Sequence, residues 1–138
     1  MEKYELIDHT ADVGIKAYGK SLEECFENAA HGMFDIITDK SEIENTGQFI
    51  ITLEADDLEQ LLVDWLSELL YINSAYNLVF GFFKVELDDK QNKLSAKVFG
   101  EKFDISKHKA GAEIKAVTYH MLQVKKKKPF FVQVLFDI

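Results

Sequence analysis

The chain has 138 residues, of which 47% are hydrophobic and 29% are charged. This length suits one domain with a continuous core. The apolar residues are too frequent for a disordered chain and too often interrupted by charges for a membrane span. The net charge of −8, with lysine supplying all 16 basic residues, predicts little direct RNA binding, because phosphate contacts need a cationic surface and arginine forks are absent.

The first part of the chain predicts two strands and a helix. Residues 4–9 and 13–18 have the pattern of short strands on either side of the segment 9–14. Ser21 and Glu24 then form a capping box, in which the hydroxyl accepts a backbone N–H and the carboxylate reaches back, so a helix should begin there. Its apolar residues recur every three or four positions on one face: Leu22, Cys25, Phe26, Ala29, Ala30, Met33, Phe34 and Ile37.

Cys25 is the only cysteine, which excludes an internal disulfide and a zinc site of several thiolates. It lies on the apolar helical face, so we expect a buried thiol that behaves as a small hydrophobic group. The chain has no secretory signal pattern, and we expect it to be cytoplasmic.

A second helix follows a strand over residues 49–53. Asp57 and Gln60 have the spacing of a helix start. The next residues form the clearest amphipathic helix in the chain, and we expect this apolar face to belong to the core: Leu58, Leu61, Leu62, Trp65, Leu66, Leu69 and Leu70.

The rest of the chain predicts strands over residues 78–87, 94–100, 114–124 and 130–138. Both faces of residues 114–124 are partly apolar, which favours a central strand. Consecutive strands favour antiparallel pairing. The sequence therefore predicts an α+β fold in a single domain, with a mostly antiparallel sheet and two main amphipathic helices.

Four consecutive lysines, Lys125 to Lys128, precede Pro129 between the last two predicted strands. Like charges followed by proline are typical of a solvated hairpin loop. A docking patch for anionic RNA or protein is the alternative interpretation.

Two acids, an imidazole and a hydroxyl gather in residues 8–14, where the chain passes from one strand to the next. Such a density of polar groups at a bend suggests a functional site. The alternative is a turn in which Asp12 binds backbone amides and Gly14 permits an unusual backbone angle. No phosphate loop, nucleophile elbow or helical pair of histidines is present, so we assign no catalytic residue.

Asp137 lies on the face of the last strand opposite to Phe136 and Ile138. A carboxylate in so apolar a strand must face water, a cation or a metal, because burial without a partner is costly. If the natural chain ends at Ile138, its own oxygens lie within one residue of Asp137. Ligands of this kind suit calcium or magnesium.

Three stretches give the sequence a resemblance to the archease family: residues 9–14, residues 115–120 and residues 136–138. Their order and the chain length also agree, so the resemblance spans residues 1–138 as a single archease-like domain. It implies an α+β fold of duplicated strand-helix-strand-strand units, although the sequence itself shows no such duplication.

The resemblance also implies a function. Archeases are accessory proteins that activate the RtcB-type RNA ligase of tRNA splicing and RNA repair by promoting its guanylylation and turnover. A chaperone-like role toward a tRNA cytosine methyltransferase is a further implied function. By resemblance, Asp12, Asp137 and Ile138 would bind a divalent metal, calcium first and magnesium as the alternative. Lys115, with His9 and His120 from the same motifs, would be the candidate contacts to a partner or nucleotide.

Two other classes of function compete with this hypothesis. In a metal-dependent hydrolase, Asp12 and Asp137 would hold the ion and His9 or His120 would act as base. A plain binding module would use no metal, and calcium would then leave its stability unchanged.

Overall fold

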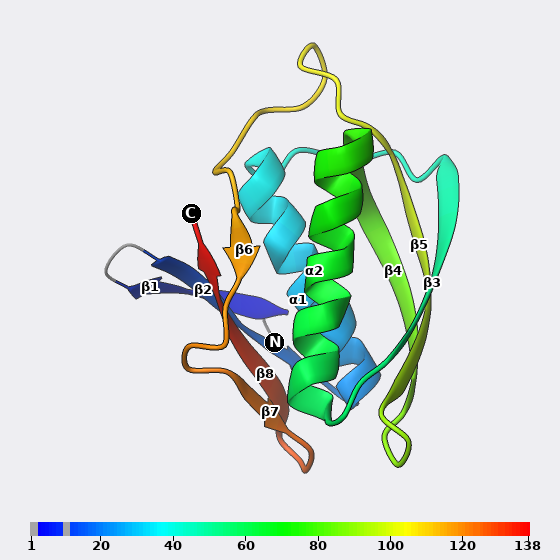
Figure 1. Ribbon diagram of the computed structural model, residues 1–138. Coiled ribbons are helices and arrows are strands. Elements are labelled where there is room, and N and C mark those ends of the chain that lie inside the picture. The colour runs from blue at the N-terminus through cyan, green and yellow to red at the C-terminus, as the bar shows by residue number, and fades with distance from the viewer. Residues whose placement is uncertain (1–2, 10–11) are drawn as a thin grey trace.

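The structure, a computed structural model, describes residues 3–9 and 12–138. The strands of these residues form two antiparallel sheets, which are accompanied by two helices (Figure 1). The elements are β1 (Tyr4–His9), β2 (Asp12–Gly19), α1 (Leu22–Thr38), β3 (Gly47–Glu54), α2 (Leu58–Tyr76), β4 (Leu78–Asp88), β5 (Lys93–Lys102), β6 (Ala116–Val117), β7 (Gln123–Lys125) and β8 (Phe130–Asp137).

The first sheet has the strand order β1-β2-β8-β6, and β7 pairs with the same edge of β8 further along. The second sheet has the order β3-β5-β4. Figure 1 shows α1 and α2 lying between these sheets. Helix α1 contacts both β2 and β4, so it connects the two sheets through one core.

A duplicated unit becomes visible in this topology. β3, α2, β4 and β5 form a strand-helix-strand-strand unit in which the third strand lies between the first and second. β2, α1, β7 and β8 repeat this arrangement, because β8 lies between β2 and β7. The unit of β3, α2, β4 and β5 is inserted after α1 and so separates β2 and α1 from β7 and β8 along the sequence. This interruption hides the repeat from a sequence comparison.

Both helices begin where the sequence predicts. The Ser21 hydroxyl accepts the Glu24 N–H at 3.2 Å, and the Glu24 carboxylate accepts the Lys20 N–H at 3.2 Å. The Asp57 carboxylate accepts the Gln60 N–H at 2.7 Å. Each cap satisfies backbone donors that the first turn of a helix leaves without partners.

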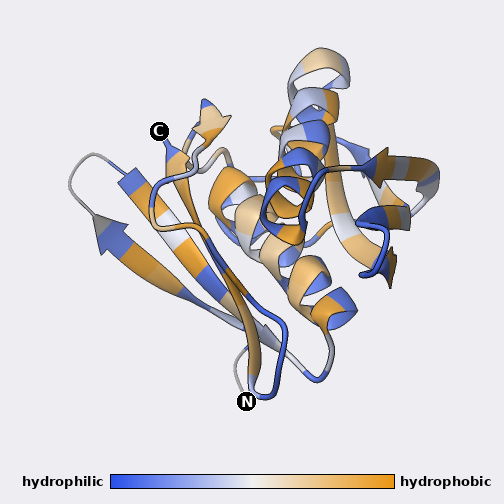
Figure 2. Ribbon diagram, turned by 60° about the horizontal axis from the view of Figure 1, so that its bottom comes forward, coloured by the Kyte–Doolittle hydropathy of each residue, from blue (hydrophilic) through white to orange (hydrophobic). Residues whose placement is uncertain are grey.

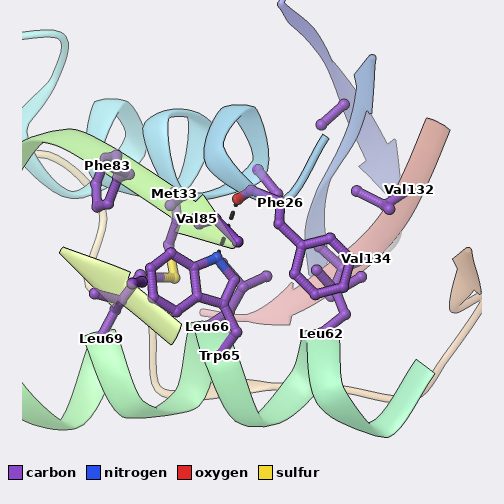
Figure 3. Packing of buried hydrophobic residues seen from close by; sticks show 14 of the residues in the cluster. Phe26, Met33, Leu62, Trp65, Leu66, Leu69, Phe83, Val85, Val132 and Val134 are labelled. Atoms are coloured by element: carbon purple, nitrogen blue, oxygen red, sulfur yellow. Dashed lines mark hydrogen bonds between the residues drawn. The ribbon is translucent and has the colours of Figure 1, made fainter. Parts of the chain in front are cut away.

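The core lies where the helices meet the sheets, and Trp65 of α2 is fully buried in it (Figure 3). Its indole N–H donates to the Phe26 carbonyl of α1 at 3.0 Å, which satisfies the one polar atom of the side chain. Cys25 is buried as expected, and burial, followed by the charge of Glu24, raises the pKa of its thiol to about 12.

Figure 2 shows apolar segments recurring along the helices and strands, whereas the connecting loops are mostly hydrophilic. No helix in the described residues has the length and apolar character needed to cross a membrane.

The prediction of one central strand over residues 114–124 is wrong. The segment is divided into β6 and β7, and both lie at an edge of the first sheet, whereas β8 occupies the central position. Between them Met121 adopts a left-handed conformation with φ 56°. Two side chains hold this loop to β8: Thr118 Oγ1 donates to the Leu135 carbonyl at 2.9 Å, and Gln133 Nε2 donates to the Met121 carbonyl at 2.9 Å. These side-chain bonds replace the ladder that a continuous strand would form.

Candidate metal centre

Four residues lie side by side at one end of the first sheet, and we call them the terminal row: His9, Asp12, Asp137 and Ala116. His9 is opposite Asp12, Asp12 is opposite Asp137, and Asp137 is opposite Ala116. Residues directly opposite each other on neighbouring strands project from the same face. Phe136 is fully buried on the helix side, so Asp137, and with it Asp12 and Ala116, project from the outer face of the sheet.

Asp12 and Asp137 are therefore direct cross-strand neighbours. Their Cβ atoms are expected about 4.5–5.5 Å apart, which allows both carboxylates to bind one ion with oxygen to metal distances of about 2.3–2.6 Å. Asp137 is exposed and Asp12 is half-buried. Two like charges placed opposite each other destabilise a sheet, and a cation between them removes that repulsion.

Lys115 adjoins the same row. Its N–H donates to the Asp137 carbonyl at 2.7 Å, which fastens the start of β6 to the end of β8. The Thr118 N–H donates to the Leu135 carbonyl at 2.9 Å and so fastens the other end of the short strand. Residues 115–118 of the motif thus lie along the strand that ends in Asp137.

The structure places the remaining candidate residues differently. Ile138 directly follows the row and is 43% exposed. His120 lies in the loop between β6 and β7, where its N–H donates to Thr118 Oγ1 at 3.3 Å, so it is not a member of the row. The side chain of His9, and residues 10–11 of the same motif, lie outside the described part of the chain.

The donor set fits a hard cation with open coordination positions. Within residues 3–9 and 12–138, no group of three or more His, Cys, Asp or Glu side chains is arranged to hold a metal ion. Asp12 and Asp137 supply a pair of carboxylates, and further oxygens would come from the main chain at Ile138, from water or from a ligand. Such all-oxygen coordination suits calcium or magnesium, whereas zinc prefers nitrogen and sulfur.

Gly14, at the end of the motif, is explained by a close approach and not by an unusual backbone angle. It lies within β2 and does not have a positive φ. A Cβ atom there would stand 2.9 Å from Leu135 Cδ1 and 2.9 Å from the Val134 carbonyl oxygen. The alternative in which Gly14 permits an unusual backbone angle is therefore wrong, and the glycine instead makes room for β8.

A groove next to Lys115 was missed in the sequence. It has a volume of about 510 Å³, and its lining residues come from α2 and from the segment before and within β6: Ser67, Leu70, Tyr71, Ser74, Glu113, Ile114, Lys115, Ala116 and Val117. The helical periodicity predicted only a core role for α2. The residue that could have indicated the groove is Tyr71, a large aromatic residue of this helix that is 59% exposed.

These features define a class of small α+β proteins, made of two strand-helix-strand-strand units with an acidic pair where β2 and β8 meet at one end of the first sheet. The model of the family described as "Archease protein family (MTH1598/TM1083)" matches residues 4–138. The chain belongs to the archease family.

Individual relatives match this chain over nearly the full length of both proteins. The protein archease of Pyrococcus furiosus is 44% identical over 128 residues, which cover 91% of this chain and 90% of the relative. The protein archease of Methanosarcina barkeri is 45% identical, with 91% and 88% covered. The solution structure of Methanobacterium thermoautotrophicum Protein 1598 superposes with a TM-score of 0.86 at 38% identity, and each chain is covered completely.

The comparisons confirm the resemblance and the α+β fold inferred from the sequence. Membership of the family supports an accessory protein of the archease type.

Proposed function

We propose that this protein activates an RtcB-type RNA ligase by promoting its guanylylation and turnover, and that a divalent cation at Asp12 and Asp137 is part of the activating surface. The observation that supports this most directly is the cross-strand pairing of those two aspartates. It puts both carboxylates at an open end of the sheet, where a partner can reach them.

The chain's own residues have separate parts in this proposal. Asp12 and Asp137 hold the cation, and main-chain oxygens at Ile138 are available beside them. A bound calcium or magnesium ion would supply positive charge that stabilises phosphate oxygens of the ligase's nucleotide. Lys115, which is exposed and fastened to Asp137 by its backbone, offers a point charge to the same anionic group.

The surface charge favours contact with the ligase over general RNA handling. The net charge of −8 and the absence of arginine disfavour a broad phosphate-binding surface. The groove between α2 and β6 runs beside Lys115 and offers both hydroxyl groups and apolar side chains to a protein partner. Activation would thus pass through the end of the sheet that contains the terminal row.

Single-turnover guanylylation of a matched RtcB-type ligase by GTP tests the proposal. The protein should accelerate the reaction, and Asp12→Asn, Asp137→Asn and Lys115→Ala should each reduce the acceleration at least about tenfold, as expected for loss of one charged contact worth about 1.4 kcal/mol or more. Asp89→Asn and Lys109→Ala make the same changes at exposed positions elsewhere and should leave it intact.

Full activation by all three site variants would contradict the role of the terminal row. No acceleration by the unmodified protein would contradict ligase activation itself. The tRNA methyltransferase and the metal-dependent hydrolase would then become the functions to test, with methyltransferase solubility and specificity, or hydrolysis of model phosphate esters, as readouts.

A further inference from the structure

Six of the 16 lysines gather at the end of the first sheet where β2 ends and β8 begins, and we call this group the lysine end: Lys16, Lys20, Lys125, Lys126, Lys127 and Lys128. The register brings them together, since Lys125 and Tyr18 are both opposite Phe131 and Gly19 is opposite Phe130. The sequence shows only the run of four. Lys16 and Lys20 are added by the pairing of β2 with β8.

Aromatic rings hold two of these ammonium groups on the outer face. Lys16 Nζ lies 4.3 Å from the ring centroid of Phe131 and 5.8 Å from that of Tyr18. Lys125 Nζ lies 5.9 Å from the Phe131 centroid. Cation–π contacts of this kind orient an ammonium group without neutralising its charge.

The ion pairs among the described residues do not include the six lysines of the lysine end. Two carboxylates lie close by and hydrogen-bond to other groups: Glu5, opposite Lys16, accepts the Tyr18 hydroxyl at 2.7 Å, and Glu24 accepts the Lys20 N–H. With six lysines against these two acids, the local balance of charge is positive. Lys20 and residues 126–128 are exposed.

The lysine end and the terminal row lie at opposite ends of one face. Phe131 and Asp137 both project outward from β8, and the six residue steps between them span about 20 Å at about 3.4 Å per residue. Figure 1 shows the β7–β8 hairpin and the C-terminus at opposite ends of the sheet. A partner bound at the acidic end would thus have the lysine end projecting beside it.

We propose that the lysine end binds the phosphate backbone of RNA, so that it contacts the RNA substrate while the terminal row engages the ligase; this part rests on the proposed function. Lysines are point charges that bind phosphates without reading bases, so the contact is independent of sequence. The hairpin tip, residues 126–129, consists of three lysines and a proline and has no large apolar side chain, which disfavours insertion into a bilayer.

This local charge is compatible with the acidic composition. The net charge of −8 governs the surface as a whole, and with six lysines at one end the remainder is correspondingly more acidic. An RNA strand would therefore be attracted to the lysine end and repelled from the rest, which gives a weak contact a defined position.

Fluorescence anisotropy with a labelled RNA hairpin and the protein alone, at salt concentrations from about 50 to 200 mM, tests this inference. The protein should bind with strong salt dependence. The triple variant Lys126→Gln, Lys127→Gln, Lys128→Gln should bind at least about tenfold more weakly at the lowest salt, and the slope of log K against log salt should decrease in magnitude by about 2–3. The control triple Lys84→Gln, Lys90→Gln, Lys97→Gln makes the same change in charge on the second sheet and should change affinity less than about threefold.

Several outcomes would overturn the inference: no RNA binding by the unmodified protein at the lowest salt, an equal loss in both triple variants, or tight binding of phosphatidylserine vesicles or polyglutamate instead of RNA. Circular dichroism should show both variants folded, because the lysines of the hairpin tip are exposed. Stimulation of guanylylation without RNA should be unchanged in the hairpin variant. Failure of RNA binding with intact stimulation would therefore reject only this inference, whereas loss of stimulation by the unmodified protein rejects the proposed function.

Discussion

Asp12 and Asp137, which come from the two ends of the chain, are paired directly opposite each other across β2 and β8. Each is the terminal paired residue of its strand, so no further rung of the ladder separates the two carboxylates from solvent. The pairing creates local like-charge repulsion and, equally, a place where a divalent cation is favoured.

Calcium should stabilise the folded protein through this pair. A ligand that binds only the native state raises the free energy of unfolding by about 2.7 kcal/mol when its concentration is 100 times its Kd. Thermal unfolding followed by circular dichroism, with calcium or with EDTA, measures the effect. Asp137→Asn should abolish the calcium-dependent shift and Asp89→Asn should retain it; a shift that survives in Asp137→Asn would place the ion elsewhere.

Without metal, the same substitution should raise the free energy of unfolding and not lower it. Asp137→Asn removes one of two facing charges, so in EDTA its free energy of unfolding should exceed that of the unmodified protein by about 0.2–1 kcal/mol. Urea unfolding at low ionic strength is the suitable measurement, because salt screens the repulsion. Destabilisation in EDTA would show that the Asp137 carboxylate has a favourable partner within the protein.

Residues appended after Ile138 should weaken calcium binding. In a protein that ends at Ile138 they would replace a carboxylate by a peptide group, and in any case they would crowd the exposed end of β8. A short polar peptide added after Ile138 should lower the affinity in isothermal titration calorimetry and weaken ligase activation, whereas the same peptide placed before Met1 should do less harm. Equal effects of both extensions would argue against Ile138 as part of the site.

Gly14→Ala should destabilise the protein by about 1–3 kcal/mol, the usual cost of forcing an extra carbon into packed surroundings. The new Cβ atom would stand 2.9 Å from the Val134 carbonyl oxygen, which the strand ladder holds in place. Gly47→Ala is the matched control, because its Cβ atom would meet the Gly100 oxygen at 3.3 Å. Urea unfolding should show the larger loss for Gly14→Ala, and similar losses would contradict the close approach of β8.

An ion cluster around Glu101 predicts a stability that depends on pH. Burial alone would raise the pKa of Glu101, but hydrogen bonds from Lys107, from the Glu44 N–H and from His108 lower it from 4.5 to about 2. The Glu101 and His108 side chains are 3.0 Å apart, and that of His108 is fully buried. The cluster ties the segment before β3 to the segment after β5.

Because the pKa of Glu101 is lower in the folded state, the unfolded chain binds more protons as the pH falls. The stabilisation by the Glu101 carboxylate is therefore complete above a pH of about 4.5 and is lost as the pH falls through about 2. Over this interval the unmodified protein should lose about 1–3 kcal/mol more than Glu101→Gln does. Urea unfolding at a series of pH values measures both curves, and parallel curves would contradict the role of this carboxylate.

Much of the local structure was predictable from the sequence. The capping residues Ser21 and Asp57 and the apolar periodicity after them determine where α1 and α2 begin and which faces they bury, since these signals lie within a few residues of the structure they specify. Alternation located most strands in the same way. It failed over residues 114–124, because a pattern of alternating side chains does not show whether a neighbouring strand is present on both sides.

For the candidate site, too, the sequence determined some features and the tertiary structure decided others. The sequence by itself determined that Asp12 and Asp137 are polar groups at strand ends and that four lysines precede Pro129. Only the tertiary structure decided that the two aspartates face each other, that Lys115 adjoins them, and that Lys16 and Lys20 join the hairpin lysines at the far end. The reason is physical: propensity and periodicity act between near neighbours in the chain, whereas the register of β2 on β8 is selected by burial of their inner faces against α1.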